Sequence, residues 1–384
     1  MVKSNIKNQD TLTRFVCTFV FVLFSFFYLY YYQADLMTVI QHVLSKGQTH
    51  YNHFIGAVLI VLVLLLIQVG VVNLFRKMRV AWALTFVPSA LCLLALTDVH
   101  TSFNDGNLEY GWWMYCLPVL MCVYYTLVLV SFKTGFSKVM CQLVKSPVRN
   151  LWVNLLAITI CMAMVCAFGN SDKTYHARIH AEQCILKNNF DEALETLRLC
   201  DNVDENTTML TMYALSKKKM LPESLFCYRL KGNSKAMMPY GDELRFEIIP
   251  DSSFFSYLGT WYVQKMPAMK YLDYQLRHRR MTKVTADYLL CGYLLDKKLD
   301  AFANAIGRYY VVNDSVSLPK HYREALILYT HLHSAPKIVY NNDVMNADFQ
   351  DYQKLEKSTS DDRIRKNLLR ETYGNTYWYY YQYL

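Results

Sequence analysis

Five apolar segments without a single ionisable side chain constrain the fold of this chain more than any other feature. They are Phe15–Tyr32, Phe54–Phe75, Val80–Thr97, Gly111–Phe132 and Leu151–Phe168. A helix rises about 1.5 Å per residue, so segments of this length approach or exceed the roughly 30 Å of hydrocarbon in a bilayer. Backbone groups inside lipid have no water to bind, so each spanning segment must be a helix. The sequence therefore predicts five transmembrane helices within residues 1–169.

Basic residues alternate along the loops between these segments. The N-terminal arm, the second loop and the fourth loop carry most of them: Lys3, Lys7, Arg14, Arg76, Lys77, Arg79, Lys133, Lys138, Lys145 and Arg149. In the first and third loops, Lys46 is the single lysine or arginine. Loops rich in lysine and arginine stay in the cytoplasm. Five crossings then predict a cytoplasmic N-terminus and a C-terminal domain outside the cytoplasm, which in a bacterium means the periplasm.

Residues 170–384 show helical periodicity of a different kind. The stretch YHARIHAEQCILKNNFDEALETLRLC predicts two helices that meet at Asn188 and Asn189. Its core positions are Ala181, Phe190, Ala193, Leu194 and Leu197. In a second copy, about 31 residues later, Leu221 and Leu225 take the places of Phe190 and Leu194. In a third copy, Leu299 takes the place of Phe190 at the start of the second helix. Paired helices with such a period are typical of α-solenoids. We expect an all-α chain: five transmembrane helices, then a soluble domain of helical hairpins.

The last residues, RETYGNTYWYYYQYL, are unusually aromatic. One interpretation is a capping helix whose rings cover the last hairpin, and it is the favoured one. The other is an exposed surface in which Tyr377, Trp378, Tyr380 and Tyr381 contact lipid headgroups, a sugar or a peptide. The sequence leaves both open.

No motif for a metal or a cofactor is evident. Cys184, Cys200, Cys227 and Cys291 lack metal-ligand spacing, and whether they form disulfides stays open. His176 and His180 lie one helical turn apart, but the glutamate of H-E-x-x-H and a third ligand are missing. Phosphate-binding and dinucleotide-binding glycine loops are also missing from the sequence. We therefore expect neither a metal nor a cofactor.

Charge excludes several classes of function. Residues 170–384 carry 29 Lys or Arg and 26 Asp or Glu, and this small excess of positive charge is not typical of a nucleic-acid-binding domain. Ion-coupled pumps need ionisable groups inside the membrane, and the five segments have none. Asp35, Asp98 and Asp105 fall on the predicted outer side, where a glycosyltransferase using lipid-linked sugars would keep a catalytic acid. Single aspartates more often cap helices, so an enzyme is only the alternative.

Two resemblances add to these expectations. The stretches YYYQADLMTVIQHVLSKGQTHYN, PSALCLLALTDV, LPKHYREALILY and YGNTYWYYYQYL resemble an uncharacterised family of multi-spanning inner-membrane proteins from Bacteroides and related bacteria. Residues 170–330 resemble degenerate tetratricopeptide repeats, which implies a concave, partner-binding face. We expect a scaffold that sits in the lipid bilayer and binds a protein of the cell envelope. The sequence determines neither that partner nor the oligomeric state.

Overall fold

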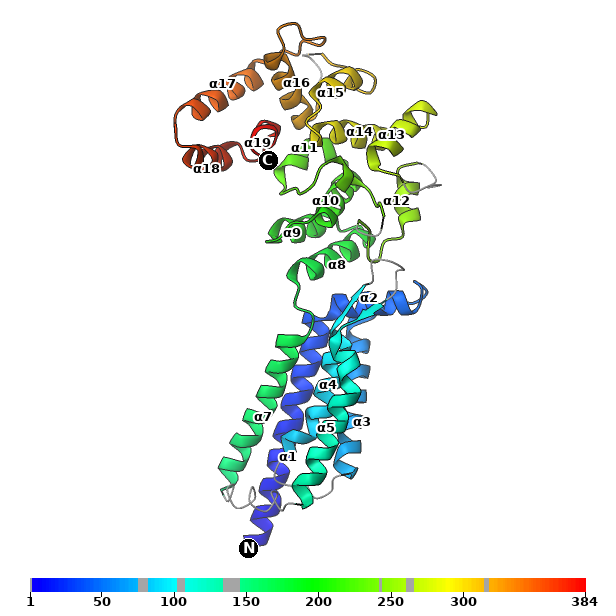
Figure 1. Ribbon diagram of the computed structural model, residues 1–384, viewed down its shortest axis with the longest axis vertical. Helices are drawn as coiled ribbons and strands as arrows, with labels where there is room; N and C mark the ends of the chain where they lie inside the picture. Colours follow the sequence, from blue (N-terminus) through cyan, green and yellow to red (C-terminus); the bar gives the residue numbers. More distant parts are fainter. Residues whose placement is uncertain are drawn as a thin grey trace. The chain divides into compact units, whose positions relative to one another are not determined.

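The computed structural model describes residues 2–74, 82–101, 108–133, 146–241, 244–259, 266–313 and 318–384. The chain divides into two compact units, Met1–Asp172 and Lys173–Leu384 (Figure 1). Asp105 and the basic residues Arg76, Lys77, Arg79, Lys138 and Lys145 lie outside the described residues. Each unit is described by itself below.

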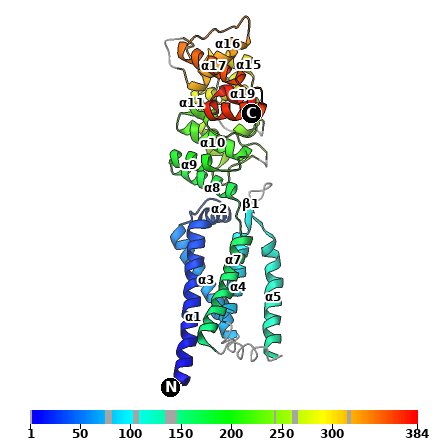
Figure 2. The same ribbon diagram turned by 90° about the vertical axis from the view of Figure 1, so that its left-hand side faces the viewer.

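The first unit is a helical bundle with one short β-ribbon. Its elements are α1 (Val2–Phe27), a π-helical turn η1 (Tyr28–Tyr32), α2 (Ala34–Leu44), α3 (His53–Leu74), a 3-10 turn η2 (Trp82–Phe86), α4 (Val87–Thr97), β1 (Val99–Thr101), β2 (Leu108–Tyr110), α5 (Trp112–Lys133) and α7 (Pro147–Phe168). The two strands pair antiparallel, with Val99 opposite Tyr110. Figure 2 shows the long helices of this unit side by side.

Four helices of the described residues are long and apolar enough to cross a membrane, and the prediction of five was wrong in this respect. They cover Thr11–Tyr32, His53–Leu74, Trp112–Ser131 and Val148–Phe168. The described part of the remaining apolar segment is helical over Trp82–Thr97, as η2 and α4, and this helix is too short to count as a span by itself. Its side chains are mostly buried among the other helices, and burial inside a bundle selects for the same apolar residues as lipid does.

Polar side chains inside the bundle connect its helices. Gln68 donates to the Thr85 hydroxyl at 3.1 Å, and the Asn154 side chain accepts the Ala83 amide at 2.9 Å. The Asn154 bond satisfies an amide at the start of η2, where backbone amides lack partners within the helix, and the Gln68 bond joins α3 to η2 through side chains. At the other end, Gln33 donates to the Asn170 carbonyl and the Asn170 amide donates to the Thr97 carbonyl, at 2.9 and 3.0 Å. The chain therefore returns to one end of the bundle after α1, α4 and α7.

The second unit is built from short helices that follow one another (Figure 1). They are α8 (Lys173–Leu186), α9 (Phe190–Leu199), α10 (Glu205–Lys217), α11 (Leu221–Ser224), η3 (Leu225–Cys227), η4 (Ser234–Met237), α12 (Asp251–Tyr257), α13 (Ala268–Arg277), α14 (Lys283–Leu295), α15 (Leu299–Ile306), α16 (Lys320–Leu332), α17 (Asp343–Lys357), α18 (Asp362–Tyr373) and α19 (Tyr377–Tyr383).

One turn recurs in the pairs α8–α9, α10–α11 and α14–α15. Asn188, Lys219 and Lys297 adopt positive φ of 59, 61 and 58°, and the next helix begins two residues later each time. The amide after each of them donates to the carbonyl five residues earlier at 2.8 Å, as in Asn189 to Cys184. This is the Schellman arrangement that ends a helix on a left-handed residue. The three copies aligned in the sequence therefore share one turn geometry.

The core positions expected from the first two copies lie in one hydrophobic cluster. Ala181, Ala193, Leu194, Leu197, Leu221 and Leu225 are buried, and Phe190 is half-buried against the same cluster. Phe190 is the first residue of α9 and stays partly exposed to solvent.

The aromatic tail is part of this core. Tyr377, Trp378 and Tyr380 are 0, 2 and 7% exposed, and Tyr381 is half-buried. The Trp378 indole donates to the Glu324 carbonyl at 2.8 Å, and the Tyr377 and Tyr380 hydroxyls donate to Leu294 and Leu295 carbonyls at the end of α14. The two tyrosines therefore cap the end of α14, and Trp378 binds α16 within its length. Their burial leaves little of these side chains for a membrane or ligand surface.

Candidate functional site

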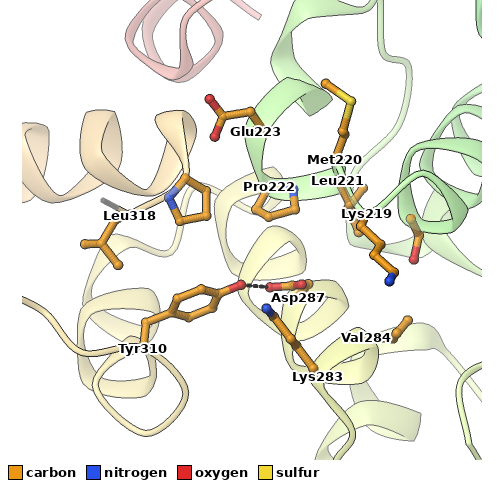
Figure 3. Close-up of a pocket in the computed structure, with 12 residues that line it drawn as sticks. Lys219, Met220, Leu221, Pro222, Glu223, Lys283, Val284, Asp287, Tyr310 and Leu318 are labelled. Carbon is orange, nitrogen blue, oxygen red and sulfur yellow. Dashed lines mark hydrogen bonds between the residues drawn. The ribbon is translucent and has the colours of Figure 1, made fainter. Parts of the chain in front are cut away.

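A cavity of about 610 Å³ lies in the second unit, where the turn before α11 faces the starts of α14 and α16 (Figure 3). Ligand pockets in proteins commonly measure roughly 300–1,000 Å³. Its apolar lining consists of Met220, Leu221, Pro222, Val284, Leu318 and Pro319. Its polar lining includes Lys219, Glu223, Lys283, Asp287 and Tyr310. Lys219, Glu223 and Lys283 are exposed, so charge of both signs surrounds the mouth of the cavity.

Local sequence explains how these side chains reach the cavity. The left-handed turn at Lys219 ends α10, and Pro222 in the first turn of α11 starts the next helix. Thr282 and Thr285 form a capping box at the start of α14, with bonds of 2.7 and 3.2 Å between side chains and amides. The cap fixes the first turn of α14, from which Lys283 and Asp287, one turn apart, face the cavity.

Asp287 is the most constrained charged group of the cavity. Its Oδ1 accepts hydrogen bonds from the Tyr310 hydroxyl at 2.6 Å and from the Tyr322 hydroxyl at 3.1 Å. Burial raises the pKa of the Asp287 carboxyl above its ordinary value, although the two hydroxyls and Lys283 act in the opposite direction. Figure 3 shows Lys283 reaching over Asp287 from the same helix. A ligand backbone amide or cation would find an acceptor here.

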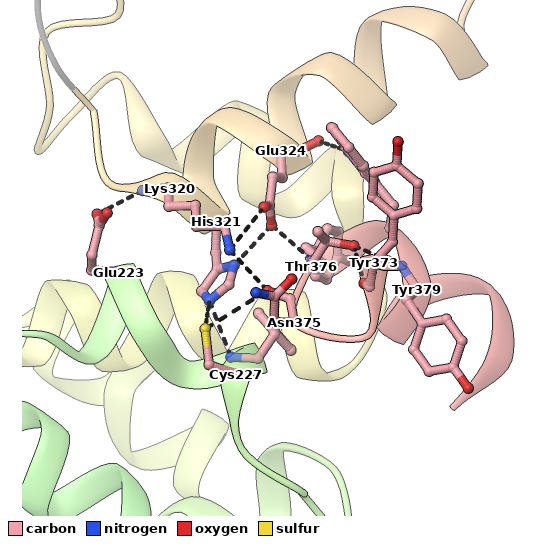
Figure 4. Close-up of polar contacts among 12 residues, drawn as sticks. Glu223, Cys227, Lys320, His321, Glu324, Tyr373, Asn375, Thr376 and Tyr379 are labelled. Carbon is pink, nitrogen blue, oxygen red and sulfur yellow. Dashed lines mark hydrogen bonds and ion pairs between the residues drawn. The ribbon is translucent and has the colours of Figure 1, made fainter. Parts of the chain in front are cut away.

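A buried polar cluster lies next to the cavity (Figure 4). Glu223 accepts the Lys320 amide at 2.7 Å, which ties α11 to the start of α16. One residue on, the His321 Nδ1 lies 2.8 Å from Glu324 Oε2, and that oxygen also accepts the Tyr377 amide at 2.7 Å. His321 and Glu324 are 0 and 1% exposed. The cluster therefore holds α11, α16 and α19 together behind the cavity.

This cluster has the composition of a cysteine nucleophile with its base, but its geometry fits a structural role. The Cys227 Sγ lies 3.9 Å from His321 Nε2, while the same nitrogen accepts the Phe226 backbone amide at 3.2 Å. A general base needs its lone pair for the proton of the nucleophile, and here a fixed amide already occupies it. The ring then carries its proton on Nδ1, toward Glu324.

Two of the three aspartates considered for an enzyme, Asp35 and Asp98, lie within the described residues. Asp98 ends α4, and its Oδ2 accepts the Trp113 amide at 3.3 Å, as a cap for α5 does. Asp35 lies in the first turn of α2. Among the described residues, neither belongs to a group of three potential metal ligands. Asp105 lies outside the described residues.

The cysteines of the second unit are free thiols in this structure. Cys184, Cys200 and Cys291 are buried and Cys227 is exposed. The Cys291 Sγ lies 3.7 Å from the Tyr322 hydroxyl, inside the core behind Asp287.

Sequence reasoning missed the polar residues of the cavity and of its supporting cluster. Asp287 meets Tyr310 and Tyr322 from 23 and 35 residues away, and Glu324 meets Tyr377 from 53 residues away. Such separations leave no periodic signal. The one local signal was the spacing of His321 and Glu324 within LPKHYREALILY, three residues apart on one helical face.

Comparison with known proteins identifies one matching region. A model described as a family of unknown function (DUF6057) matches residues 262–384, which contain α13 to α19. That stretch contributes the α14 and α16 walls of the cavity and the aromatic tail, whereas the α11 wall and the membrane helices lie outside it. No curated protein and no solved structure matches the chain.

Proposed function

We propose that this chain is a membrane-anchored scaffold whose second unit binds an extended segment of an envelope protein. The observation that carries the proposal is the cavity between α11, α14 and α16. Its apolar lining suits one or two side chains of a peptide, and the acceptor Asp287 with the exposed Lys219, Glu223 and Lys283 suits its backbone and charges. Helical-repeat proteins bind peptides on such surfaces between successive helix pairs.

The proposed location is the bacterial inner membrane, with the second unit in the periplasm. The alternation of basic loops supports this orientation. Hydrogen bonds that join Gln33, Thr97 and Asn170 add support, because they bring the residues that follow η1, α4 and α7 together at one end of the bundle. Although α4 is short, the chain is thus at the same end of the bundle after α4 as after α1. The tetratricopeptide-like character of the hairpins is part of the same proposal, and the shared turn at Asn188, Lys219 and Lys297 supports it.

Purification of the tagged full chain from native membranes in mild detergent tests the proposal. The cavity variant combines Lys219→Glu and Lys283→Glu, both at exposed positions, so the fold should survive. The matched control combines Lys187→Glu and Lys270→Glu, which are exposed lysines away from the cavity. We expect a stoichiometric protein partner with the wild type and the control, and its loss with the cavity variant.

Two results would contradict parts of the proposal. A partner that remains with the cavity variant would contradict the cavity as its binding surface. A preparation without protein partners that carries a polyprenyl-phosphate or glycolipid would favour the enzyme alternative, with Asp35 and Asp105 as the first residues to mutate.

A further inference from the structure

Three side chains with metal-binding atoms converge in the first hairpin of the second unit. His180 and Cys184 lie one turn apart on α8, and Glu192 lies in the first turn of α9. One ligand atom from each lies within 4.8 Å of the other two. The His180 Nε2 is 3.5 Å from Glu192 Oε1. Among the described residues, this is the one group of three or more such side chains.

The backbone fixes this arrangement before any ion binds. The left-handed Asn188 ends α8 and lets α9 begin at Phe190, which returns Glu192 to the level of Cys184 and His180. Asn189, the residue before α9, donates its side-chain amide to the second oxygen of Glu192. A ligand whose other atom is held by a neighbour keeps its orientation, as outer-shell groups do in metal sites.

The three donors differ in chemistry in a way that selects the ion. An imidazole nitrogen, a thiolate and a carboxylate oxygen together suit Zn²⁺, whereas Mg²⁺ and Ca²⁺ prefer oxygen ligands alone. The thiolate and carboxylate would neutralise the two charges of the ion. Cys184 is 4% exposed, Glu192 is exposed and His180 is half-buried, so an ion reaches a buried sulfur from the solvent side.

We propose that His180, Cys184 and Glu192 bind Zn²⁺, with water as the fourth ligand. On binding, the Cys184 thiol loses its proton to solvent, and the zinc–sulfur bond forms in its place. The ion links α8 to α9 and stabilises the hairpin on which the rest of the unit is stacked. This inference is independent of the peptide cavity, because it shares no residue with it.

The experiment uses the full chain in detergent, with an affinity tag that lacks histidine and with its metal removed by chelator under reducing conditions. Zinc affinity is measured by competition with a chromogenic chelator, with Mg²⁺ as the hard-ion control. Cobalt is then added as a spectroscopic probe, because thiolate ligation gives a sulfur-to-cobalt charge-transfer band. We expect one zinc per chain, the cobalt band, and no response to Mg²⁺.

Variants distinguish ligands from neighbours. Glu192→Gln at its exposed site and Cys184→Ala should each weaken zinc binding by at least the roughly 10–100-fold seen for outer-shell changes, and Cys184→Ala should abolish the cobalt band. Cys200→Ser and His176→Ala, a second buried thiol and the other histidine of the same hairpin, should leave both unchanged. The site would be overturned if the chain bound no zinc, if the cobalt band survived Cys184→Ala, or if Cys200→Ser weakened zinc binding as much as Cys184→Ala does. Each of these outcomes is independent of the partner purification.

Discussion

Raising the pH from about 4.5 to about 8 is expected to destabilise the wild-type chain relative to the Glu182→Gln variant. Glu182 lies on α8 and is 1% exposed. Its carboxyl accepts the backbone amides of Glu247, Ile248 and Ile249 at 2.7–3.2 Å. Burial raises the pKa of Glu182 from an ordinary 4.5 to about 7, and the charge of nearby Glu247 acts in the same direction. The hydrogen bonds from the three amides act in the opposite direction.

The sign and size of the effect follow from this difference in pKa. Between pH 4.5 and 7 the folded chain retains a proton on Glu182 that the unfolded chain has lost, so the free energy of unfolding falls as pH rises through this window. A shift from 4.5 to about 7, at 1.36 kcal/mol per pKa unit, amounts to about 3 kcal/mol. Other titrating groups are common to both chains and cancel in the comparison.

Thermal unfolding of both full-length chains in detergent, followed by tyrosine and tryptophan fluorescence, measures the difference. For a unit of this size, about 3 kcal/mol corresponds to roughly 6–12 °C in Tm. The wild type should lose that much relative to Glu182→Gln across the window, while Glu195→Gln, an exposed change on α9, should follow the wild type. A wild type that gains stability relative to Glu182→Gln as the pH rises would mean that the three amides outweigh burial, and it would refute the reasoning.

Three further predictions concern the hairpins, the tail and the orientation. Lys297→Gly should raise the free energy of unfolding by about 1 kcal/mol by relieving a left-handed lysine, and Lys298→Gly, at an ordinary φ of −89°, should not; equal Tm values would contradict this. Trp378→Ala should cost about 3–5 kcal/mol and expose the tail to protease, since the indole is 2% exposed; a tail as resistant as the wild type would count against its core role. A chain whose only cysteine is the exposed Cys227 should react with an impermeant maleimide added on the periplasmic side. A chain whose only cysteine is introduced by Lys77→Cys should not react. The reverse pattern would invert the proposed orientation.

The sequence predicted the helical class and the first hairpin because both depend on local pattern. Apolar spacing and the pair Asn188–Asn189 give α8 and α9 with the expected break between them. The count of spans failed at Val80–Thr97 because hydropathy measures transfer out of water, and burial among helices removes water as completely as lipid does. The ribbon of β1 and β2 carries three residues per strand, too few for a periodic signal.

The candidate sites were harder to predict because their partners meet through the fold. In YHARIHAEQCILKNNFDEALETL, the pair His176 and His180 has the spacing of two metal ligands, but without a third ligand the sequence predicted no metal site. The structure instead places His180 with Cys184, one turn ahead, and with Glu192 across the turn. The i, i+4 spacing of His180 and Cys184 was visible in the sequence, but only the hairpin geometry makes Glu192 the third member.

The recurring turn explains why the proposed zinc site belongs to one hairpin only. In the first copy, His180 and Cys184 lie eight and four residues before the left-handed Asn188, and Glu192 lies four residues after it. The same three positions around Lys219 hold Thr211, Leu215 and Glu223. Around Lys297 they hold Leu289, Tyr293 and Ala301. The acid after the turn persists in the second copy, where Glu223 lines the cavity and accepts the Lys320 amide. The same turn thus places an acid at the equivalent position in two hairpins. Only in the first hairpin are the residues eight and four before the turn potential metal donors. The third copy lacks every donor and serves as the reference hairpin inside the same chain.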